Sequence, residues 1–260
     1  MNIFQAVVLG IIQGITEFLP VSSSGHLVLF QKLFRIQEPT MFFDVVLHIG
    51  TLIPVFIIFW DKIFALIKKP FQKYSYLIIA ATLPAVIVAL LFGDQIENLF
   101  DSGKFLAPAF IFTGIILLYA DKAANKKNDE NISFGDSLAI GFMQAVAIIP
   151  GVSRSGSTIS ASLACGLNKN SAAKFSFILS IPAIIGAAVL QLKNVIANQN
   201  FSFSAPIIFG FIAAIFSGYL SIKFMLKLIN ESKLKFFSYY VFTLAFFIFI
   251  DQFFLKLFFA

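Results

Sequence analysis

The sequence predicts an all-α, polytopic membrane protein built as an inverted-topology repeat, and three observations carry this prediction. Of its 260 residues, 59% are hydrophobic and 12% are charged, whereas a soluble domain is about 25% charged. Several apolar stretches are long enough to cross a bilayer. Two short segments, which begin at Gly10 and Gly141, are versions of each other. A duplicated segment in an apolar chain indicates two related halves.

The apolar stretches fall into two length classes. A helix that crosses the hydrocarbon needs about 20 mainly apolar residues. We expect such spans at 41–60, 74–93, 105–121, 175–192, 205–224 and 236–255. Shorter pieces form two pairs, 2–19 with 22–34 and 135–149 with 153–167. Because proline ends or kinks a helix, Pro20 and Pro150 separate the members of each pair. Each pair is predicted to form a re-entrant helical hairpin, and the alternative is two ordinary spans.

The distribution of lysine predicts the orientation. Segments 61–73, 122–133 and 223–235 are rich in lysine, whereas 93–104 and 193–204 are not. Cytoplasmic loops carry an excess of Lys and Arg, so the first three segments are assigned to the cytoplasm. The first hairpin then enters from outside and the second from the cytoplasm. Each half is therefore expected to be a re-entrant hairpin followed by three transmembrane helices.

These boundaries define the expected domain organisation. The whole chain, 1–260, is one membrane domain, with repeat one at 1–121, a linker at 122–133 and repeat two at 134–260. No Lys or Arg precedes Lys32, so no cleavable signal peptide is expected. The single cysteine excludes an internal disulfide. The formal charge of +6 is attributed to cytoplasmic loops, and nucleic acid is not an expected partner.

The two related segments contain the candidate site. They run over 10–26 and 141–157 and are identical at the pairs Gly10/Gly141, Gln13/Gln144, Val21/Val152, Ser22/Ser153, Ser24/Ser155 and Gly25/Gly156. Each includes a Ser/Gly-rich break. A helix that begins at such a break presents free backbone N–H groups and the positive end of its dipole, which together bind anions. Arg154 adds a planar fork suited to phosphate oxygens. The pattern favours a phosphate-type ligand.

The first break also carries groups that can move protons. Glu17 precedes it by about one helical turn, and His26 follows its serines. A carboxylate inside a membrane is a candidate functional group, and histidine exchanges protons near neutral pH. With a serine hydroxyl, these residues supply the parts for nucleophilic displacement at phosphorus. The alternative is structural: Ser and Gly also serve close helix packing. His48, with Asp44 nearby, is interpreted as a supporting hydrogen-bonding group.

The residues at both breaks resemble a known family. Segment 13–26 resembles the first motif of the undecaprenyl-diphosphatase family, the bacitracin-resistance BacA/UppP proteins. Segment 150–158 resembles its second motif, PGxSRSxxT. The resemblance covers the whole chain. It implies an integral membrane phosphatase that converts undecaprenyl diphosphate to undecaprenyl phosphate and inorganic phosphate, which recycles the lipid carrier for peptidoglycan synthesis. Because bacitracin sequesters the diphosphate, such an enzyme confers resistance.

The resemblance also assigns roles to residues. It implies that the catalytic residues are Glu17, Ser23, His26 and Arg154. Ser23 is the expected nucleophile, and direct attack by His26 is the alternative. The expected substrate-binding residues are Gln13, Ser22, Ser24, Gly25, Ser153, Ser155, Gly156 and Thr158. The resemblance implies a divalent cation, Mg²⁺ or Ca²⁺, with Glu17 as a metal ligand. Gln13 stands where the family also allows glutamate, so a metal site with two carboxylates is not expected.

These assignments predict partners and a location. The partners are a polyprenyl diphosphate lipid and the bilayer, and a homodimer is left open. The chain is expected in the bacterial cytoplasmic membrane as a multi-pass protein whose active site faces the extracytoplasmic side. A lipid-phosphate flippase that uses the same midplane anion site is the alternative function, and an anion channel is a weaker third.

Overall fold

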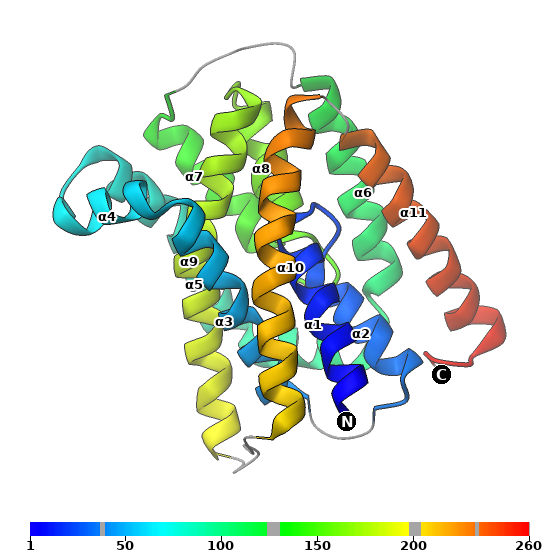
Figure 1. The fold of residues 1–260 in the computed structure, drawn as a ribbon. Coiled ribbons are helices and arrows are strands. Elements are labelled where there is room, and N and C mark those ends of the chain that lie inside the picture. The colour runs from blue at the N-terminus through cyan, green and yellow to red at the C-terminus, as the bar shows by residue number, and fades with distance from the viewer. Residues whose placement is uncertain (37–39, 124–130, 198–203, 232–233, 260) are drawn as a thin grey trace.

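The computed structural model describes residues 1–36, 40–123, 131–197, 204–231 and 234–259. This part of the chain folds into a bundle of α-helices that ends in a short π-helix (Figure 1). The helices are α1 (Ile3–Phe18), α2 (Ser23–Leu33), α3 (Met41–Ile58), α4 (Trp60–Lys68), α5 (Lys73–Ser102), α6 (Leu106–Ala123), α7 (Phe134–Val146), α8 (Arg154–Ala164), α9 (Lys169–Ala197), α10 (Ala205–Asn230), α11 (Leu234–Ile250) and the π-helix Asp251–Leu255.

The prediction of a polytopic membrane protein is confirmed. Among the described residues, 6 helices are long and apolar enough to cross a membrane, namely α3, α5, α6, α9, α10 and α11. They coincide with the expected spans, although α9 begins at Lys169 rather than near 175. Several segments expected between the spans are partly helical, because α9 extends to Ala197 and α10 to Asn230. α4 occupies most of 61–73, and α5 continues to Ser102 past a kink at Phe92, where φ is −123° and ψ is 18°.

The remaining bundle helices are short. α1 has 16 residues, α7 has 13, and α2 and α8 have 11 each. At about 1.5 Å per residue, even α1 is only about 24 Å long, less than the roughly 30 Å of bilayer hydrocarbon. A side chain caps the N-terminus of the first helix in each pair. Asn2 forms a capping box with Gln5 at α1, and Ser133 does so with Asp136 at α7. Each pair therefore begins at a defined helix start and turns back at a Ser/Gly break.

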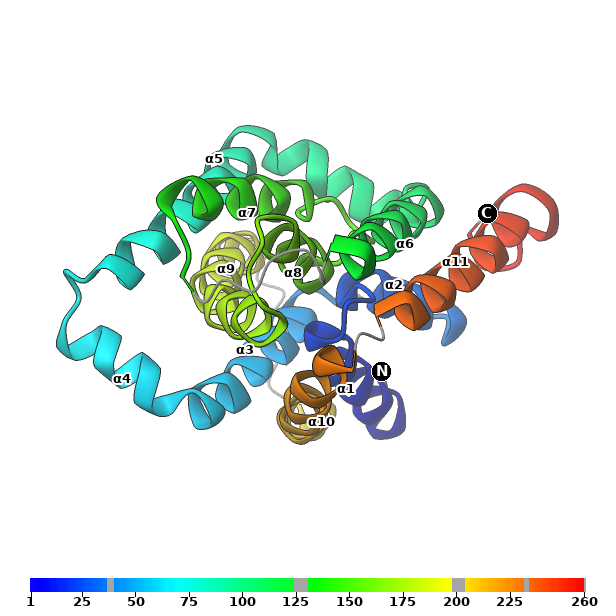
Figure 2. The ribbon, with the colours of Figure 1, turned by 90° about the horizontal axis from the view of Figure 1, so that it is seen from above.

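Helices of the N-terminal half of the chain pack against helices of the C-terminal half. α1 lies along α10, α7 lies along α5, and α6 pairs with α11 (Figure 2). Two equivalent glycines permit the first two contacts. A Cβ on Gly10 would collide with the carbonyl oxygen of Gly210, and a Cβ on Gly141 would lie 2.7 Å from that of Ala81. The identity of Gly10 and Gly141 therefore reflects the same close helix approach.

The helix ends next to the lysine-rich segments lie at the same end of the bundle. The helix ends that lead into the three lysine-rich segments, at α3, α6 and α10, lie toward the upper end in Figure 1. Both termini and the ends of α5 and α9 lie toward the opposite end. The described helix ends that adjoin the basic segments thus share one end of the bundle, which agrees with the assignment of these segments to one side of a membrane.

Candidate active site

Both Ser/Gly breaks form the N-terminus of a helix. Ser22 precedes α2 with a left-handed φ of 72°, and its side chain accepts a hydrogen bond from the N–H of Gly25 at 3.2 Å. Ser153 precedes α8, and its side chain accepts from the N–H of Gly156 at 3.0 Å. A serine that caps the first turn satisfies one of the free N–H groups there. The Ser/Gly identities between the two segments therefore reflect matching helix caps.

The two breaks meet in the interior. The N–H of Gly151 donates to Ser24 Oγ at 3.4 Å, and Ser155 Oγ donates to the carbonyl oxygen of Leu19 at 2.9 Å. Gly151 has a φ of 89°, a conformation that favours glycine. A Cβ on Gly25 would lie 3.2 Å from the Cα of Gly151. The structure thus brings together two segments that are far apart in the sequence.

Glu17 is the centre of the polar cluster. Its Oε1 accepts a hydrogen bond from Arg154 Nη2 at 2.6 Å. Its Oε2 accepts from Ser23 Oγ at 2.6 Å and from Gln13 Nε2 at 2.9 Å. Glu17 is buried, and the guanidinium of Arg154 neutralises its charge. The ion pair joins a residue of the first break to one of the second. Three of the four predicted catalytic residues, Glu17, Ser23 and Arg154, therefore lie in one cluster.

The second helix pair and α9 hold Arg154 in place. Arg154 Nη1 donates to the carbonyl oxygen of Ser176 at 3.3 Å. The Oγ atoms of Thr158 and Ser176 are 2.6 Å apart. Next to Ser176, Phe177 packs edge-on against Phe18 with ring centroids 5.6 Å apart. The residue that follows Glu17 therefore packs against the residue that follows Ser176, the backbone partner of Arg154.

His26 makes its contacts elsewhere. Its Nδ1 lies 2.7 Å from the carbonyl oxygen of Ser22, and its Nε2 lies 2.8 Å from the hydroxyl of Tyr240. A carbonyl only accepts, so Nδ1 carries the proton and Nε2 of the neutral ring accepts from Tyr240. The two rings also stack, with centroids 5.7 Å apart and an angle of 11° between their planes. Both nitrogens of His26 are therefore engaged outside the Glu17 cluster.

The predicted substrate-binding residues divide into two groups. Ser22 and Ser153 cap α2 and α8 by accepting from the N–H groups of Gly25 and Gly156. The hydroxyl of Ser155 donates to the carbonyl oxygen of Leu19, and that of Thr158 is used within α8 and toward α9. These hydroxyls hold the backbone, and their positions at helix N-termini leave N–H groups as the natural anion donors. The second group is Gln13 and Ser24. Gln13 donates a hydrogen bond to Glu17, and the hydroxyl of Ser24 accepts one from the N–H of Gly151.

Two residues near the site, Tyr240 and Ser176, carried no clear signal in the sequence, whereas a third, His48, was predicted to be a supporting hydrogen-bonding group. His48 Nε2 lies 3.8 Å from Glu17 Oε2, while its Nδ1 lies 2.7 Å from the carbonyl oxygen of Asp44. His48, for which a supporting role was predicted, therefore lies next to Glu17. Tyr240 and Ser176 contact His26 and Arg154, but a tyrosine and a serine within apolar helices are common and mark no site.

The protein groups that could hold a metal are few. Within the described ranges, no three His, Cys, Asp or Glu side chains come together as a metal site. Glu17 is the one carboxylate in the cluster, and both of its oxygens already accept hydrogen bonds. The side chain of Asp44 is bonded to Gln31 and Thr40. These donors do not fit a divalent cation held by the protein alone.

Comparison with known proteins places this arrangement in a family. The family model described as bacitracin resistance protein BacA matches residues 6–247. The chain is 51% identical over 250 residues to an undecaprenyl-diphosphatase of Carboxydothermus hydrogenoformans, which covers 94% of this chain and 95% of that protein. It is 45% identical over 255 residues to undecaprenyl-diphosphatase 3 of Bacillus cereus, with 97% and 98% covered. It is 42% identical over 274 residues to an undecaprenyl-diphosphatase of Methanobrevibacter smithii, again with 97% and 98% covered. The chain, with both of its Ser/Gly breaks inside the matched region, belongs to the BacA family of bacitracin resistance proteins.

Proposed function

We propose that this membrane protein hydrolyses undecaprenyl diphosphate to undecaprenyl phosphate and inorganic phosphate. The reaction recycles the lipid carrier used in peptidoglycan synthesis and confers resistance to bacitracin. The relatives' names and the family support this activity. The single observation in the fold that carries it is the contact of Glu17 with both Ser23 and Arg154, at 2.6 Å each. That contact joins a hydroxyl, a proton acceptor and a phosphate-binding group.

The geometry supports Ser23 as the nucleophile. Its hydroxyl already donates to Glu17, which is positioned to take the proton as Oγ attacks the terminal phosphorus. The bond from that phosphorus to the bridging oxygen breaks, and undecaprenyl phosphate leaves. Water then attacks the phosphoserine and releases inorganic phosphate. Backbone N–H groups at the start of α8 and the guanidinium of Arg154 stabilise the charge on the transferring group.

Arg154 has a second part in this proposal. In the structure described here it is paired with Glu17. A diphosphate that enters the cluster presents oxygens that compete for the same guanidinium. When Arg154 turns to the phosphate, Glu17 loses its cation and becomes free to accept the proton of Ser23. Substrate binding thereby creates the base that the reaction needs.

Trapping the phosphoenzyme tests the choice of nucleophile. Purified protein is mixed with radiolabelled prenyl diphosphate, quenched and mapped. A phosphoserine at Ser23 survives acid and is lost in alkali, whereas phosphohistidine at His26 behaves in the opposite way. Ser23→Ala should abolish labelling, and Ser238→Ala, which removes another buried hydroxyl, should keep it. Label on His26, or normal turnover of Ser23→Ala, would refute the serine mechanism.

The inverted repeat and the re-entrant hairpins belong to this proposal as its architecture. The short lengths of α1, α2, α7 and α8 and the exchanged packing of α1 with α10 and of α7 with α5 support both features. Single cysteines in a Cys165→Ser background test them. Arg35→Cys should react with an impermeant thiol reagent from outside the cell only, and Lys69→Cys from the cytoplasm only. Labelling of both from the same side would contradict the topology.

The proposal also covers location, cation and transport. The chain acts in the bacterial cytoplasmic membrane, with its site open to the extracytoplasmic side.

Mg²⁺ or Ca²⁺ would bind mainly through diphosphate oxygens, with Glu17 as the protein's contribution. The cation should then bind tightly only when a diphosphate is present, which calorimetry measures. A homodimer stays a prediction. The rival flippase is separated by phosphate release in detergent, because a flippase without hydrolysis releases none.

A further inference from the structure

α4, which is not part of the site, has an apolar face that the rest of the chain leaves uncovered. The helix follows α3 directly, with Phe59 at the junction in a non-helical conformation (φ −109°, ψ 22°). It stands out sideways from the bundle (Figures 1 and 2). Ile63, which is 5% exposed, packs into the main core, and Leu66 is partly buried against it. One side of α4 is therefore attached to the protein.

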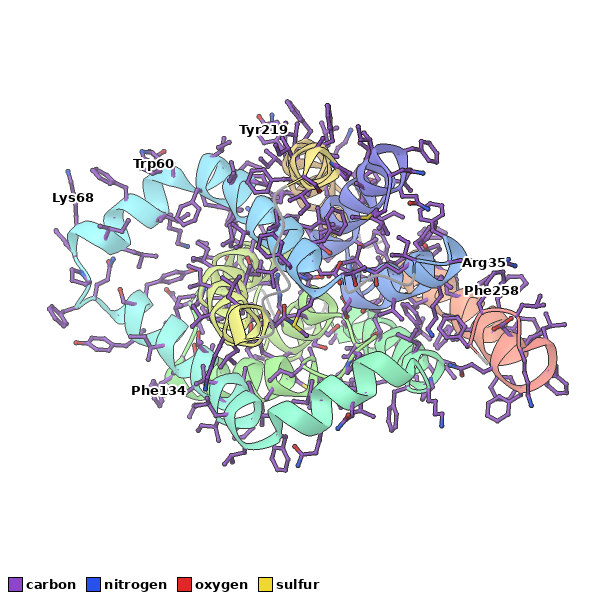
Figure 3. All side chains as sticks on the ribbon, turned by 90° about the horizontal axis from the view of Figure 1, so that it is seen from below. Arg35, Trp60, Lys68, Phe134, Tyr219 and Phe258 are labelled. Carbon is purple, nitrogen blue, oxygen red and sulfur yellow. The ribbon has the colours of Figure 1, made fainter. Side chains whose placement is uncertain are left out.

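A second side of α4 is apolar and exposed. At about 100° per residue, Trp60, Phe64 and Ile67 share a face. They are 54%, 40% and 64% exposed. The rings of Trp60 and Phe64 stack, with centroids 5.6 Å apart and planes at 14°. In Figure 3, Trp60 and Lys68 lie on the outer side of this helix, away from the bundle. Exposed apolar groups gathered in this way mark an interaction surface.

Positive charge surrounds this face. The segment 61–73 has one acidic residue, Asp61, and the lysines Lys62, Lys68, Lys69 and Lys73. Lys68 Nζ lies 4.4 Å from the centre of the Phe64 ring. Lys62 Nζ lies 4.1 Å from that of Tyr74. Burial, and then repulsion from Lys174, lowers the pKa of Lys62. The uncompensated positive charge at this corner favours an anionic partner.

We propose that α4 lies in the headgroup region of the bilayer, as an anchor that binds anionic lipids. Trp60, Phe64 and Ile67 reach the boundary with the acyl chains, and Lys68 and Lys69 contact the headgroups. An amphipathic helix with lysines beside a Trp/Phe face is the usual form of an interfacial helix. Its place next to the end of a membrane span puts it at the level of the membrane surface. Negatively charged headgroups match its lysines.

Fluorescence tests the proposal directly, because Trp60 is the only tryptophan in the chain. The full protein is placed in phosphatidylcholine vesicles whose lipids carry bromine either near the glycerol or deep in the acyl chain. We expect a blue-shifted emission, loss of most of the signal to the shallow bromine, a smaller loss to the deep one, and little quenching by aqueous acrylamide. Trp60→Phe combined with Ile87→Trp gives the reference for a side chain on a membrane-spanning helix, and it should respond most to the deep bromine.

Two outcomes would overturn the position of α4. Strong quenching by acrylamide without quenching by bromine would place its apolar face in water. Protection from both quenchers would mean that protein, such as a second copy, covers the face. Lipid charge is tested with a small fraction of brominated phosphatidylglycerol. If anionic lipids gather at α4, Trp60 should be quenched more than the fraction of brominated phosphatidylglycerol in the vesicles predicts for random mixing. Lys68→Gln combined with Lys69→Gln should lower the quenching to the value for random mixing. If the quenching of the unaltered protein equals the value for random mixing, the preference for anionic lipids would be refuted.

Discussion

Replacing Arg154 with lysine separates the shape of the guanidinium from its charge. In the structure, two different nitrogens of Arg154 reach Glu17 at 2.6 Å and the carbonyl oxygen of Ser176 at 3.3 Å. A lysine has one nitrogen, so it cannot hold this orientation and offer a fork to a phosphate. A hydrogen bond to a charged group contributes about 1.5–3 kcal/mol. If one such bond is lost in the transition state, kcat/KM falls by roughly 10- to 150-fold.

The assay is phosphate release from a prenyl diphosphate in detergent, with initial rates over a range of substrate concentrations. Because lysine still balances the charge of Glu17, thermal unfolding should change little. Arg35→Lys is the matched control, since Arg35 is the other arginine and is exposed at the end of α2. Near-normal turnover of Arg154→Lys would show that charge alone is enough. A large drop in the unfolding temperature would show that Arg154 acts mainly in folding.

Further predictions concern the groups around this pair. Glu17→Gln removes the proton acceptor and should lower kcat by about 10²- to 10⁴-fold, whereas Gln13→Ala removes one hydrogen bond to the Glu17 carboxylate and should lower kcat by about tenfold; equal losses in the rate assay would mean that the two act as a unit. His48→Ala should lower kcat/KM more than His48→Gln, because glutamine keeps a polar group near Glu17, whose Oε2 lies 3.8 Å from Nε2 of His48; identical kinetics would argue against a role for that polar group. Gly141→Ala should destabilise the fold by about 1–3 kcal/mol, because its Cβ would meet the carbonyl oxygen of Ala81 at 2.7 Å; an unchanged unfolding temperature would show that α7 and α5 separate freely.

The helices were largely predictable because their signals are local. Length and hydropathy define a membrane span, and all six expected spans are present among the described helices. The segment 61–73 shows the limit of this reasoning. Its lysines indicated a loop, yet Trp60–Lys68 is helical. Ile63 and Leu66 pack against the core, so apolar contacts on one side support a helix whose composition alone is mixed.

Side-chain partners were harder to predict than helices. The sequence placed His26 among the proton-transfer groups, but its ring bonds to Ser22 and Tyr240. Tyr240 lies in α11, far along the chain, and no spacing rule connects it to the first break. Likewise, Ser22 and Ser153 were assigned to phosphate and are found as helix caps. Here the sequence did contain a sign, because each serine stands three residues before a glycine in the first turn of a helix.

The duplicated break explains why the site needs both halves. At the positions equivalent to Glu17 and Ser23, the second segment has Ile148 and Arg154. Neither copy therefore contains both members of the ion pair. Replacing either member by a neutral residue would leave the other charge buried without its partner, which is destabilising by about 3–5 kcal/mol. The same contact joins the two segments and places the proton acceptor beside the phosphate-binding group. A chain with two copies of the first segment would keep the helix caps but would have serine in place of Arg154, so the carboxylate would face the diphosphate that the site is proposed to bind without a cation between them.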